Sequence, residues 1–325
     1  MAREVGVTAK TVSRVINEEG SVSAQTRARV LDAMSRLGYQ PNLMARNMRT
    51  GGPDSTVGLI IPDLGNPFFG TVAGGIESAM RKRGLTLIVG SSEETADGEG
   101  SLVTTFLARR VAGLLIVPSS DSDHRSLRVQ RSAGLPLVFI DRPARGLTTD
   151  CVASSHREGA RSGVAHLIAH GHRRIAFIGD SPTLHTRKER LQGYRDALAD
   201  AGIPFDRRLV ETGHDYEAAA AAVTRLLTRK DPATAVFAAN NFAATGAVLG
   251  MSRLGRRDVA LVGFDDLPLA EVLEPALTVI AQDAVAIGHA AAELLMARLD
   301  GERSKAKTVV VPTRLIVRGS GELPP

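Results

Sequence analysis

Seven short apolar runs, spread along most of the chain, constrain what this 325-residue sequence can fold into. Each is rich in Val, Ile and Leu and does not alternate apolar with polar residues: TVGLIIP, LTLIVG, GLLIVP, LPLVFID, RIAFIGD, TAVFAAN and VALVGFD. Such runs are typical of strands buried on both faces. Helical patterns separate most of them, as in GTVAGGIESAMRKRG and ATGAVLGMSRLG. The rhythm predicts an α/β fold with doubly wound parallel sheets, and this many strands predicts two lobes.

The first 40 residues follow a different, helical pattern. Thr8 can cap a helix that runs to about Asn17. The buried face of that helix is predicted to hold Val12, Val15 and Ile16. Ser23 can cap a second helix that stops at Gly38. Its apolar side is predicted to comprise Val30, Met34 and Leu37.

These patterns divide the chain into three regions: an all-α region at 1–41, a short helix and linker at 42–56, and a body at 57–325. We expect the first lobe of the body at about 57–153 plus 284–301. The second lobe is expected at about 154–283 plus 302–325. The tail stretch KTVVVPTRLIVRGS predicts an antiparallel pair of strands.

Charge is concentrated at the front of the chain. Residues 1–52 hold eight Lys and Arg against four Asp and Glu, within a net charge of +5 for the whole sequence. A short basic segment on a nearly neutral body is typical of a phosphate-binding region, with a merely solvated surface as the alternative. No apolar run approaches the roughly 20 residues of a membrane span. There is no secretion signal, and the single Cys151 fits a reducing compartment, so we expect a cytoplasmic protein with no membrane partner.

Four small or apolar positions at the N-terminus match a helix-turn-helix, in which a small residue lies where the helices touch, glycine makes the turn and two valines lock the second helix: Ala2, Gly6, Val12 and Val15. The second helix would enter the DNA major groove by its N-terminal end. There Lys10 and Arg14 can donate to guanine, and Ala9 can contact a thymine methyl. Short polar groups suited to phosphates are Thr8, Thr11, Ser13 and Asn17. The alternative is an ordinary helical region with solvated cations.

Polar and aromatic residues follow the predicted strands of the body or open the helices next to them. In doubly wound sheets, ligands bind beyond the carboxyl ends of the strands. Carboxylates, amides and Arg make paired hydrogen bonds to hydroxyls, and aromatic faces stack on sugar rings, so the expected effector is a sugar or similar polyol. Taken singly, each residue could be a strand-end turn group. The candidates are Asn66, Phe68, Phe69, Asp141, Arg142, Arg190, Asn240, Asn241, Asp265 and Gln282.

Other constellations carry little weight. His166 and His170 are four residues apart on a predicted helix and His172 follows, which is a conceivable metal cluster but not our prediction. The sequence contains no GxSxG, HExxH or GxxxxGK[ST] motif. Asp265 and Asp266 cannot readily converge on one substrate, because adjacent strand residues point to opposite faces. We therefore predict no cofactor, no metal and no catalytic site.

The stretch GVTAKTVSRVIN, together with VSAQTRARVLDAMSRLGYQPNLMARNMRTG, resembles the headpiece and hinge of the lactose-repressor (LacI/GalR) family of bacterial transcription regulators. The resemblance continues through LGNPFF, VFIDRP, GHRRIAFIGD, RLQGYRDAL, TAVFAANN, VALVGFDD and TVIAQD, in the family's order. It implies a body with the two-lobed fold of periplasmic sugar-binding proteins. It also implies that the ten candidates above match effector-contacting positions. The family usually has Asp where this chain has Asn241, so a familiar sugar is not assumed.

The resemblance also implies a role for LMARNMR. In relatives, two copies of this segment lie in the DNA minor groove and an apolar side chain wedges between base pairs. The matching residue is Met48 in place of the usual Leu, with Ala45 beside it, while Arg46 and Arg49 can reach phosphates. Read as structure alone, the segment is a linker helix. Family members begin their first helix several residues before the position of Met1. We therefore expect either a start site upstream or a shortened headpiece.

Taken together, the sequence predicts a transcriptional regulator, most simply a repressor, that binds double-stranded operator DNA as a homodimer under control of a small effector. The alternative is a sugar-binding sensor or receptor with impaired or no DNA binding. A transport receptor would have no use for residues 1–50, and no acid/base or nucleophile set supports a sugar-converting enzyme.

Overall fold

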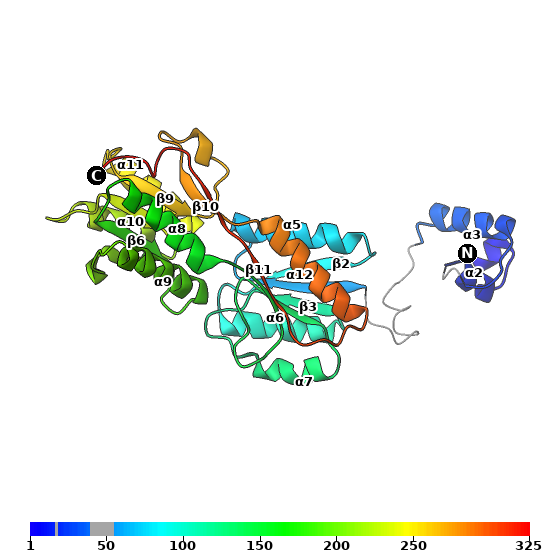
Figure 1. Ribbon diagram of the computed structural model, residues 1–325. Helices are drawn as coiled ribbons and strands as arrows, with labels where there is room; N and C mark the ends of the chain where they lie inside the picture. The colour runs from blue at the N-terminus through cyan, green and yellow to red at the C-terminus, as the bar shows by residue number, and fades with distance from the viewer. Residues whose placement is uncertain (17–18, 40–54) are drawn as a thin grey trace. The chain divides into compact units, whose positions relative to one another are not determined.

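The structure is a computed structural model that describes residues 1–16, 19–39 and 55–325. The chain divides into two compact units, Met1–Asp54 and Ser55–Pro325 (Figure 1). We call the first unit the headpiece and the second the body. The described helices of the headpiece are α1 (Ala2–Val5), α2 (Ala9–Ile16) and α3 (Ala24–Arg36).

Both predicted caps form in the headpiece. The Thr8 hydroxyl accepts from the Thr11 N–H at 3.1 Å, and the Ser23 hydroxyl accepts from the Thr26 N–H at 3.3 Å. Gly6 has φ 68°, the left-handed conformation that lets the chain turn between α1 and α2. The core of the unit consists of Val5, Val12, Val15, Val30 and Ala33.

One apolar position of the second predicted helix was wrong. Leu37 is 51% exposed, because α3 ends at Arg36 and Leu37 already belongs to the turn before Gly38. Val30 lies in the core and Met34 packs against it, as expected.

The body holds two six-stranded sheets, one in each lobe. The first sheet has the order β11-β5-β4-β3-β1-β2 and every neighbouring pair is parallel. Its strands are β1 (Thr56–Ile61), β2 (Thr86–Ser91), β3 (Gly113–Ile116), β4 (Leu137–Ile140), β5 (Asp150–Ser154) and β11 (Thr308–Val311). The second sheet has the order β12-β10-β9-β8-β6-β7 and is parallel except for β12. Its strands are β6 (Ile175–Gly179), β7 (Val210–Thr212), β8 (Ala235–Ala238), β9 (Ala260–Phe264), β10 (Thr278–Ala281) and β12 (Arg314–Ile316).

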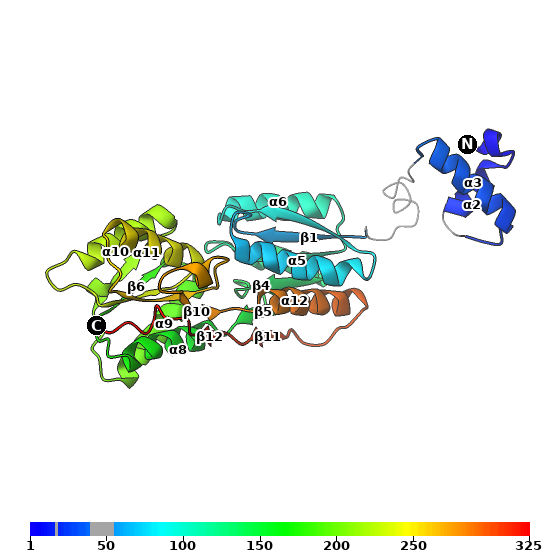
Figure 2. The same ribbon diagram turned by 90° about the horizontal axis from the view of Figure 1, so that it is seen from above.

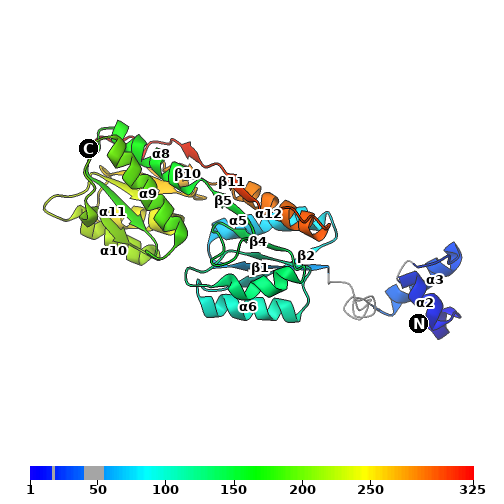
Figure 3. The same ribbon diagram turned by 60° about the horizontal axis from the view of Figure 1, so that its bottom comes forward.

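Helices cover both faces of each sheet, which confirms the predicted doubly wound architecture (Figure 3). In the first lobe, α5 and α12 pack on one face, while α6 and α7 pack on the other. The second lobe has α10 and α11 on one face, with α8 and α9 opposite. The helices are α5 (Pro67–Arg81), α6 (Ala96–Ala108), α7 (Leu127–Ser132), α8 (His156–Ala169), α9 (His185–Asp200), α10 (Tyr216–Leu227), α11 (Asn241–Arg253) and α12 (Ala284–Leu299). Short 3₁₀ turns are η1 (His124–Ser126), η2 (Arg207–Leu209) and η3 (Ala270–Val272).

The tail of the chain differs from the prediction. The antiparallel pair expected in KTVVVPTRLIVRGS does not form, because β11 pairs in parallel with β5 while β12 pairs antiparallel with β10. The two strands therefore lie in different sheets, and the chain passes between the lobes at residues 312–313 (Figure 2). Consequently 308–311 belongs to the first lobe, where we had expected 302–325 to lie in the second. The other two crossings fall between β5 and α8 and between β10 and α12.

Candidate functional site

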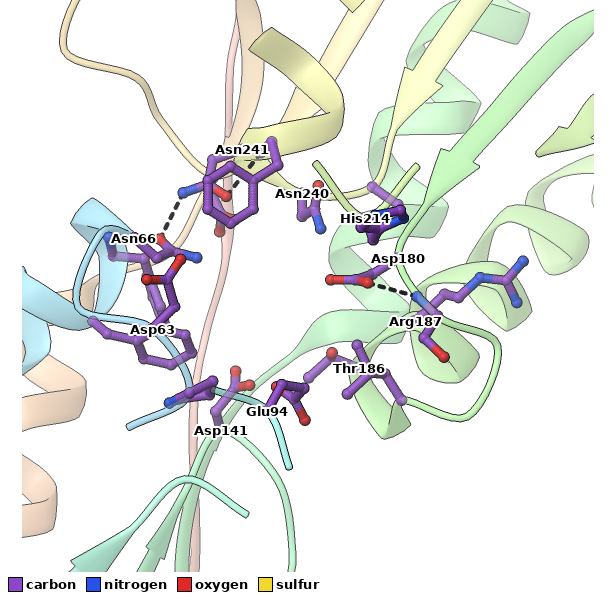
Figure 4. A pocket seen from close by; sticks show the side chains of 18 of the residues that line it. Asp63, Asn66, Glu94, Asp141, Asp180, Thr186, Arg187, His214, Asn240 and Asn241 are labelled. Atoms are coloured by element: carbon purple, nitrogen blue, oxygen red, sulfur yellow. Dashed lines mark hydrogen bonds between the residues drawn. The ribbon is translucent and has the colours of Figure 1, made fainter. Parts of the chain in front are cut away.

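A cavity of about 500 Å³ lies between the two lobes of the body, at the carboxyl ends of their strands (Figure 4). All ten residues proposed from the sequence as effector contacts line this one cavity. Thirteen further residues line it: Pro62, Asp63, Ser91, Glu93, Glu94, Asp180, Ser181, Leu184, Thr186, Arg187, His214, Ala239 and Phe242. We call this cavity the cleft.

Two side chains of the cleft wall are held in place because they cap helix N-termini. The Asn66 side chain caps α5 by accepting from the Phe68 N–H at 3.0 Å, and Asn240 caps α11 by accepting from the Ala243 N–H at 2.7 Å. Phe68 and Phe69 follow in the first turn of α5, with their rings edge to face at 5.2 Å between centroids. These residues are placed by capping chemistry that the sequence already encodes.

Arg142 is committed to partners inside the first lobe. Its Nη1 and Nη2 donate to the two carboxylate oxygens of Glu94 at 2.7 and 3.1 Å. Nη1 also donates to the Pro118 carbonyl at 2.8 Å, and Nε donates to Asp141 at 3.3 Å. A guanidinium with four of its five N–H groups in use orients the Glu94 carboxylate in the cleft and leaves little donor capacity for a ligand.

Arg190, His156 and Asp141 form a buried chain across the lobe boundary. Arg190 Nη2 donates to His156 Nδ1 at 3.3 Å, and because a guanidinium only donates, the His156 proton lies on Nε2 and faces Asp141 at 3.4 Å. Burial alone would raise the pKa of Asp141, but the His156 hydrogen bond and the charges of Arg142 and Arg190 hold it below its ordinary value. The guanidinium of Arg190 stacks 3.8 Å from the Phe264 ring centroid.

Arg190 lies deeper in its helix than expected. We had placed it at the start of a helix, whereas α9 begins at His185 and Arg190 follows in the second turn. Its Nη1 donates to the Ala239 carbonyl at 2.6 Å, which fixes the side chain at the carboxyl end of β8. Burial is the largest influence on its pKa and lowers it, while Asp265 and Asp141 act in the opposite direction.

Backbone strain is concentrated at the cleft. Five non-glycine residues in the described part of the chain have positive φ, and four of them line the cleft: Glu93, Glu94, Asp141 and Asp265, with φ of 53°, 55°, 67° and 75°. Left-handed conformations cost free energy for such residues and persist where the surroundings enforce them, commonly at functional sites. Asp265 is further held by Gln282, whose amide donates to it at 2.5 Å.

The cleft presents unused hydrogen-bonding atoms. Within residues 1–16, 19–39 and 55–325, five buried side-chain polar atoms have no hydrogen-bond partner, and three of them belong to lining residues: Arg187 Nε, Arg190 Nε and Gln282 Oε1. Six carboxylates line the cavity against three guanidinium groups. The hydroxyl groups of a polar ligand can donate to the carboxylates and to Gln282 Oε1 and can accept from the two arginine Nε groups, whereas an additional anion would meet an excess of negative charge.

A direct bond joins the lobes at the cleft. The Asn241 side-chain amide donates to the Asn66 side-chain oxygen Oδ1 at 2.7 Å (Figure 4). Asn66 belongs to the first lobe and Asn241 begins α11 in the second. The pair therefore links the two walls without any ligand.

Several lining residues escaped the sequence analysis, although the rule that was used could have found some of them. Glu93 and Glu94 follow β2, and Asp180 follows β6, so they too lie at carboxyl ends of strands. His156 does not itself line the cleft but pairs with Asp141 and Arg190, and it carried no signal because those partners are distant in sequence. His214 and Phe242 likewise reach the cleft only through the fold.

The histidine cluster proved to fasten the C-terminal segment. His166 contacts Glu322, and His172 donates or accepts at the Thr234 hydroxyl and contacts the Leu323 carbonyl at 2.8 Å. Among the residues that the structure describes, no group of three His, Cys, Asp or Glu could hold a metal ion. Likewise, no described helix is long and apolar enough to cross a membrane.

The headpiece exposes the N-terminal end of α2. Thr8, Ala9, Lys10 and Arg14 are exposed, and Thr11 and Ser13 are partly exposed, while Val12 and Val15 face the core. Of the positions proposed for DNA, Asn17, Ala45, Arg46 and Met48 lie outside the described residues. The described ones thus form an accessible, basic surface that extends along α2 from Thr8 to Arg14.

A helix-turn-helix unit joined to a two-lobed, ligand-sized cleft is the architecture of bacterial transcription regulators with a periplasmic-binding-protein-like body. The family described as bacterial regulatory proteins, lacI family, matches residues 1–42, and the periplasmic binding protein-like domain matches residues 164–321. Catabolite control protein A of Priestia megaterium is 31% identical over 98% of this chain and 97% of its own length. The chain therefore belongs to the LacI family of transcriptional regulators, whose members are DNA-binding regulators rather than enzymes.

Solved structures agree with this assignment. A complex of the transcriptional regulator CelR with cellobiose is 33% identical and covers 98% of both chains, with a TM-score of 0.75. A Lac repressor dimer bound to operator and the anti-inducer ONPF is 26% identical and covers 98% of this chain and 97% of that one, with a TM-score of 0.85.

Proposed function

We propose that this chain is a repressor without enzymatic activity that binds a near-palindromic operator in the cytoplasm as a homodimer. A neutral sugar bound in the cleft controls the affinity for DNA. The convergence of all ten expected side chains on one cavity of about 500 Å³ is the observation that carries the effector proposal. The acidic lining favours an uncharged polyol over a sugar phosphate or sugar acid. CelR, a relative, was solved with cellobiose, which supports a sugar of this kind.

The cleft contacts are tested by titration calorimetry against a panel of neutral mono- and disaccharides that includes cellobiose. The test variant is Asp265→Asn, because Asp265 is buried in the cleft wall and accepts from Gln282. The matched control is Asp266→Asn, because its neighbour Asp266 is exposed and pairs with Arg318. We expect Asp265→Asn to weaken binding of the active sugar at least about tenfold, since a charged acceptor is lost. Equal effects of the two variants would refute the cleft assignment.

The DNA contacts are tested with a duplex selected from a random pool by the full chain. Arg14→Gln removes an exposed charge from the last turn of α2, one turn beyond Lys10, and Arg36→Gln removes one from the end of α3 as the control. We expect Arg14→Gln to weaken specific binding by roughly 1–3 kcal/mol and Arg36→Gln to change it little. Failure of the wild-type chain to bind any duplex specifically would favour the sensor alternative.

A further inference from the structure

The loops at the N-terminal ends of the strands of the first sheet are strongly basic, and we call this side of the sheet its N-terminal edge. Because all six strands are parallel, their starts and the ends of α5, α6, α7 and α12 gather at this edge, away from the cleft (Figures 1 and 3). We call the loops there the basic rim. They carry ten Lys and Arg against three Asp and Glu and comprise residues 81–85, 109–112, 131–136, 148–150 and 298–307.

This excess is not shared by the body as a whole. Residues 55–325 carry 32 Lys and Arg against 30 Asp and Glu, so the body outside the basic rim is net negative. Helix C-termini attract cations everywhere, which provides a baseline. The equivalent loops of the second lobe, with eight Lys and Arg against five Asp and Glu, show that baseline; they comprise residues 170–174, 200–209, 228–234, 254–259 and 273–277. The first lobe clearly exceeds it.

Half of the Lys and Arg side chains of the basic rim form no ion pair and no side-chain hydrogen bond with the residues that the structure describes. Some are committed, as in Arg298 with Asp150, Arg83 with Asp300 and Lys307 with Glu302. Exposed cations for which the described part of the chain supplies no ion pair are Lys82, Arg109, Arg110, Arg303 and Lys305. A cavity of about 290 Å³ also lies in the rim, lined in part by Arg131, Arg298 and Arg303, of which only Arg303 belongs to these five cations. The rim thus has both loose cations and a concave surface.

The position of the rim in the chain suggests its partner. β1 begins at Thr56 on this edge, so the body starts here, where the chain arrives from the headpiece. Resting on the proposed function, we propose that the basic rim is a second nucleic-acid surface, which contacts the phosphate backbone of the duplex that flanks the site read by the headpiece.

Such a contact adds affinity without reading sequence. Each phosphate neutralised by a Lys or Arg releases counterions, so the affinity falls more steeply with salt as more phosphates are engaged. The rim consists of loops and the ends of the helices and strands beside them, with no complete helix or strand among its residues that could enter a DNA groove. Its charges are carried by flexible Lys and Arg side chains. Its contribution therefore depends on the length of the duplex and on ionic strength, and hardly on flanking sequence.

The test compares two triple variants of the full chain that remove the same residue types. The rim variant carries Lys82→Gln, Arg109→Gln and Arg303→Gln. The control variant carries Lys230→Gln, Arg207→Gln and Arg257→Gln, exposed cations in the corresponding loops of the second lobe. Each is titrated against the selected operator as a duplex of about 20 base pairs and as one extended by about 20 base pairs on each side. Salt is varied between about 50 and 200 mM.

We expect the wild-type chain to bind the extended duplex more tightly than the short one. The rim variant should lose at least about tenfold on the extended duplex at about 200 mM salt and more at about 50 mM, because its salt slope falls by about three per chain. On the short duplex it should lose little. The control variant should match the wild type. Equal losses in both variants, or no dependence on duplex length, would overturn the rim proposal while leaving the proposed function intact. Absence of specific binding by the wild type would instead refute the proposed function, and the rim proposal with it.

Discussion

Alanine substitutions at two glycines of α6, Gly98 and Gly100, are expected to have opposite effects on stability, although the glycines lie only two residues apart. An added Cβ at Gly98 would lie 2.4 Å from the Ser92 carbonyl oxygen and 2.8 Å from the Thr95 hydroxyl. At Gly100 nothing lies within 4 Å. The segment that Gly98 touches contains Glu94, which lines the cleft. The pair therefore separates helix propensity from close packing behind the cleft wall.

The magnitudes follow from these contacts. Gly100→Ala should stabilise the body by roughly 0.5–1 kcal/mol, because alanine loses less backbone entropy in an exposed helix. Gly98→Ala gains less than that at a helix start and must displace the Ser92 carbonyl by about 1 Å. The shift breaks the cap in which Gly98 N–H donates to Thr95 at 3.1 Å, worth about 1 kcal/mol, and overpacking adds roughly 1–3 kcal/mol. The net effect is destabilising by about 1–3 kcal/mol.

The assay is urea unfolding followed by circular dichroism, with sugar titration as the second readout. Since Glu94 holds Arg142 through two hydrogen bonds, Gly98→Ala should also weaken binding of the active sugar, while Gly100→Ala should leave it unchanged. If Gly98→Ala proves as stable as Gly100→Ala and binds sugar normally, the close approach of α6 to this segment is refuted.

Three further predictions concern polar side chains that are buried or partly buried. In a double-mutant cycle of Asn66→Ala and Asn241→Ala, urea unfolding should give a coupling energy of about 1 kcal/mol for the bond between the lobes, and strictly additive effects would disprove it. Glu99→Gln should lower the free energy of unfolding by roughly 1–3 kcal/mol, since Glu99 binds the buried His124 at 2.8 Å; a loss no larger than that of an exposed Glu→Gln control would contradict this. The pKa of Asp141 is lowered in the folded state, so its contribution to the free energy of unfolding is present at neutral pH and is lost as the pH falls below about 4. In Asp141→Asn, the free energy of unfolding should therefore depend less steeply on pH below about 4. An acid profile that matches the wild type would refute the assignment.

The parts of the fold that sequence could predict are those with local physical causes. β1, β8 and β9 are buried on both faces and read as continuous apolar runs. The caps Thr8 and Ser23 act within three residues of themselves. The partners of β11 and β12 could not be predicted in this way, because the alternation and length of both strands suit either sheet. Their choice depends on packing between segments more than 150 residues apart for β11.

The same distinction applies to the cleft. Asp141 and Asp265 could be identified because each directly follows a recognisable strand. The hydrogen bonds that determine their chemistry, from His156 and Gln282, come from other elements. The left-handed backbone of both residues also has no signal in the sequence, since neither is glycine. Position at a strand end predicts which residues line a cleft, whereas their charge and orientation depend on tertiary neighbours.

Asn241 shows how a departure from the family pattern acts on the whole body. A carboxylate, the usual group at this position in the LacI family, only accepts hydrogen bonds and would face the Asn66 oxygen as a second acceptor. The amide of this chain donates instead, and so ties the start of α11 to the cap of α5. The bond favours the approach of the lobes by about 1 kcal/mol without a ligand. An effector can shift the lobes only by its differential affinity for their two arrangements, so one that uses either amide must first replace this bond. The Asn66–Asn241 bond therefore sets part of the free energy that effector binding must supply to change the arrangement of the lobes.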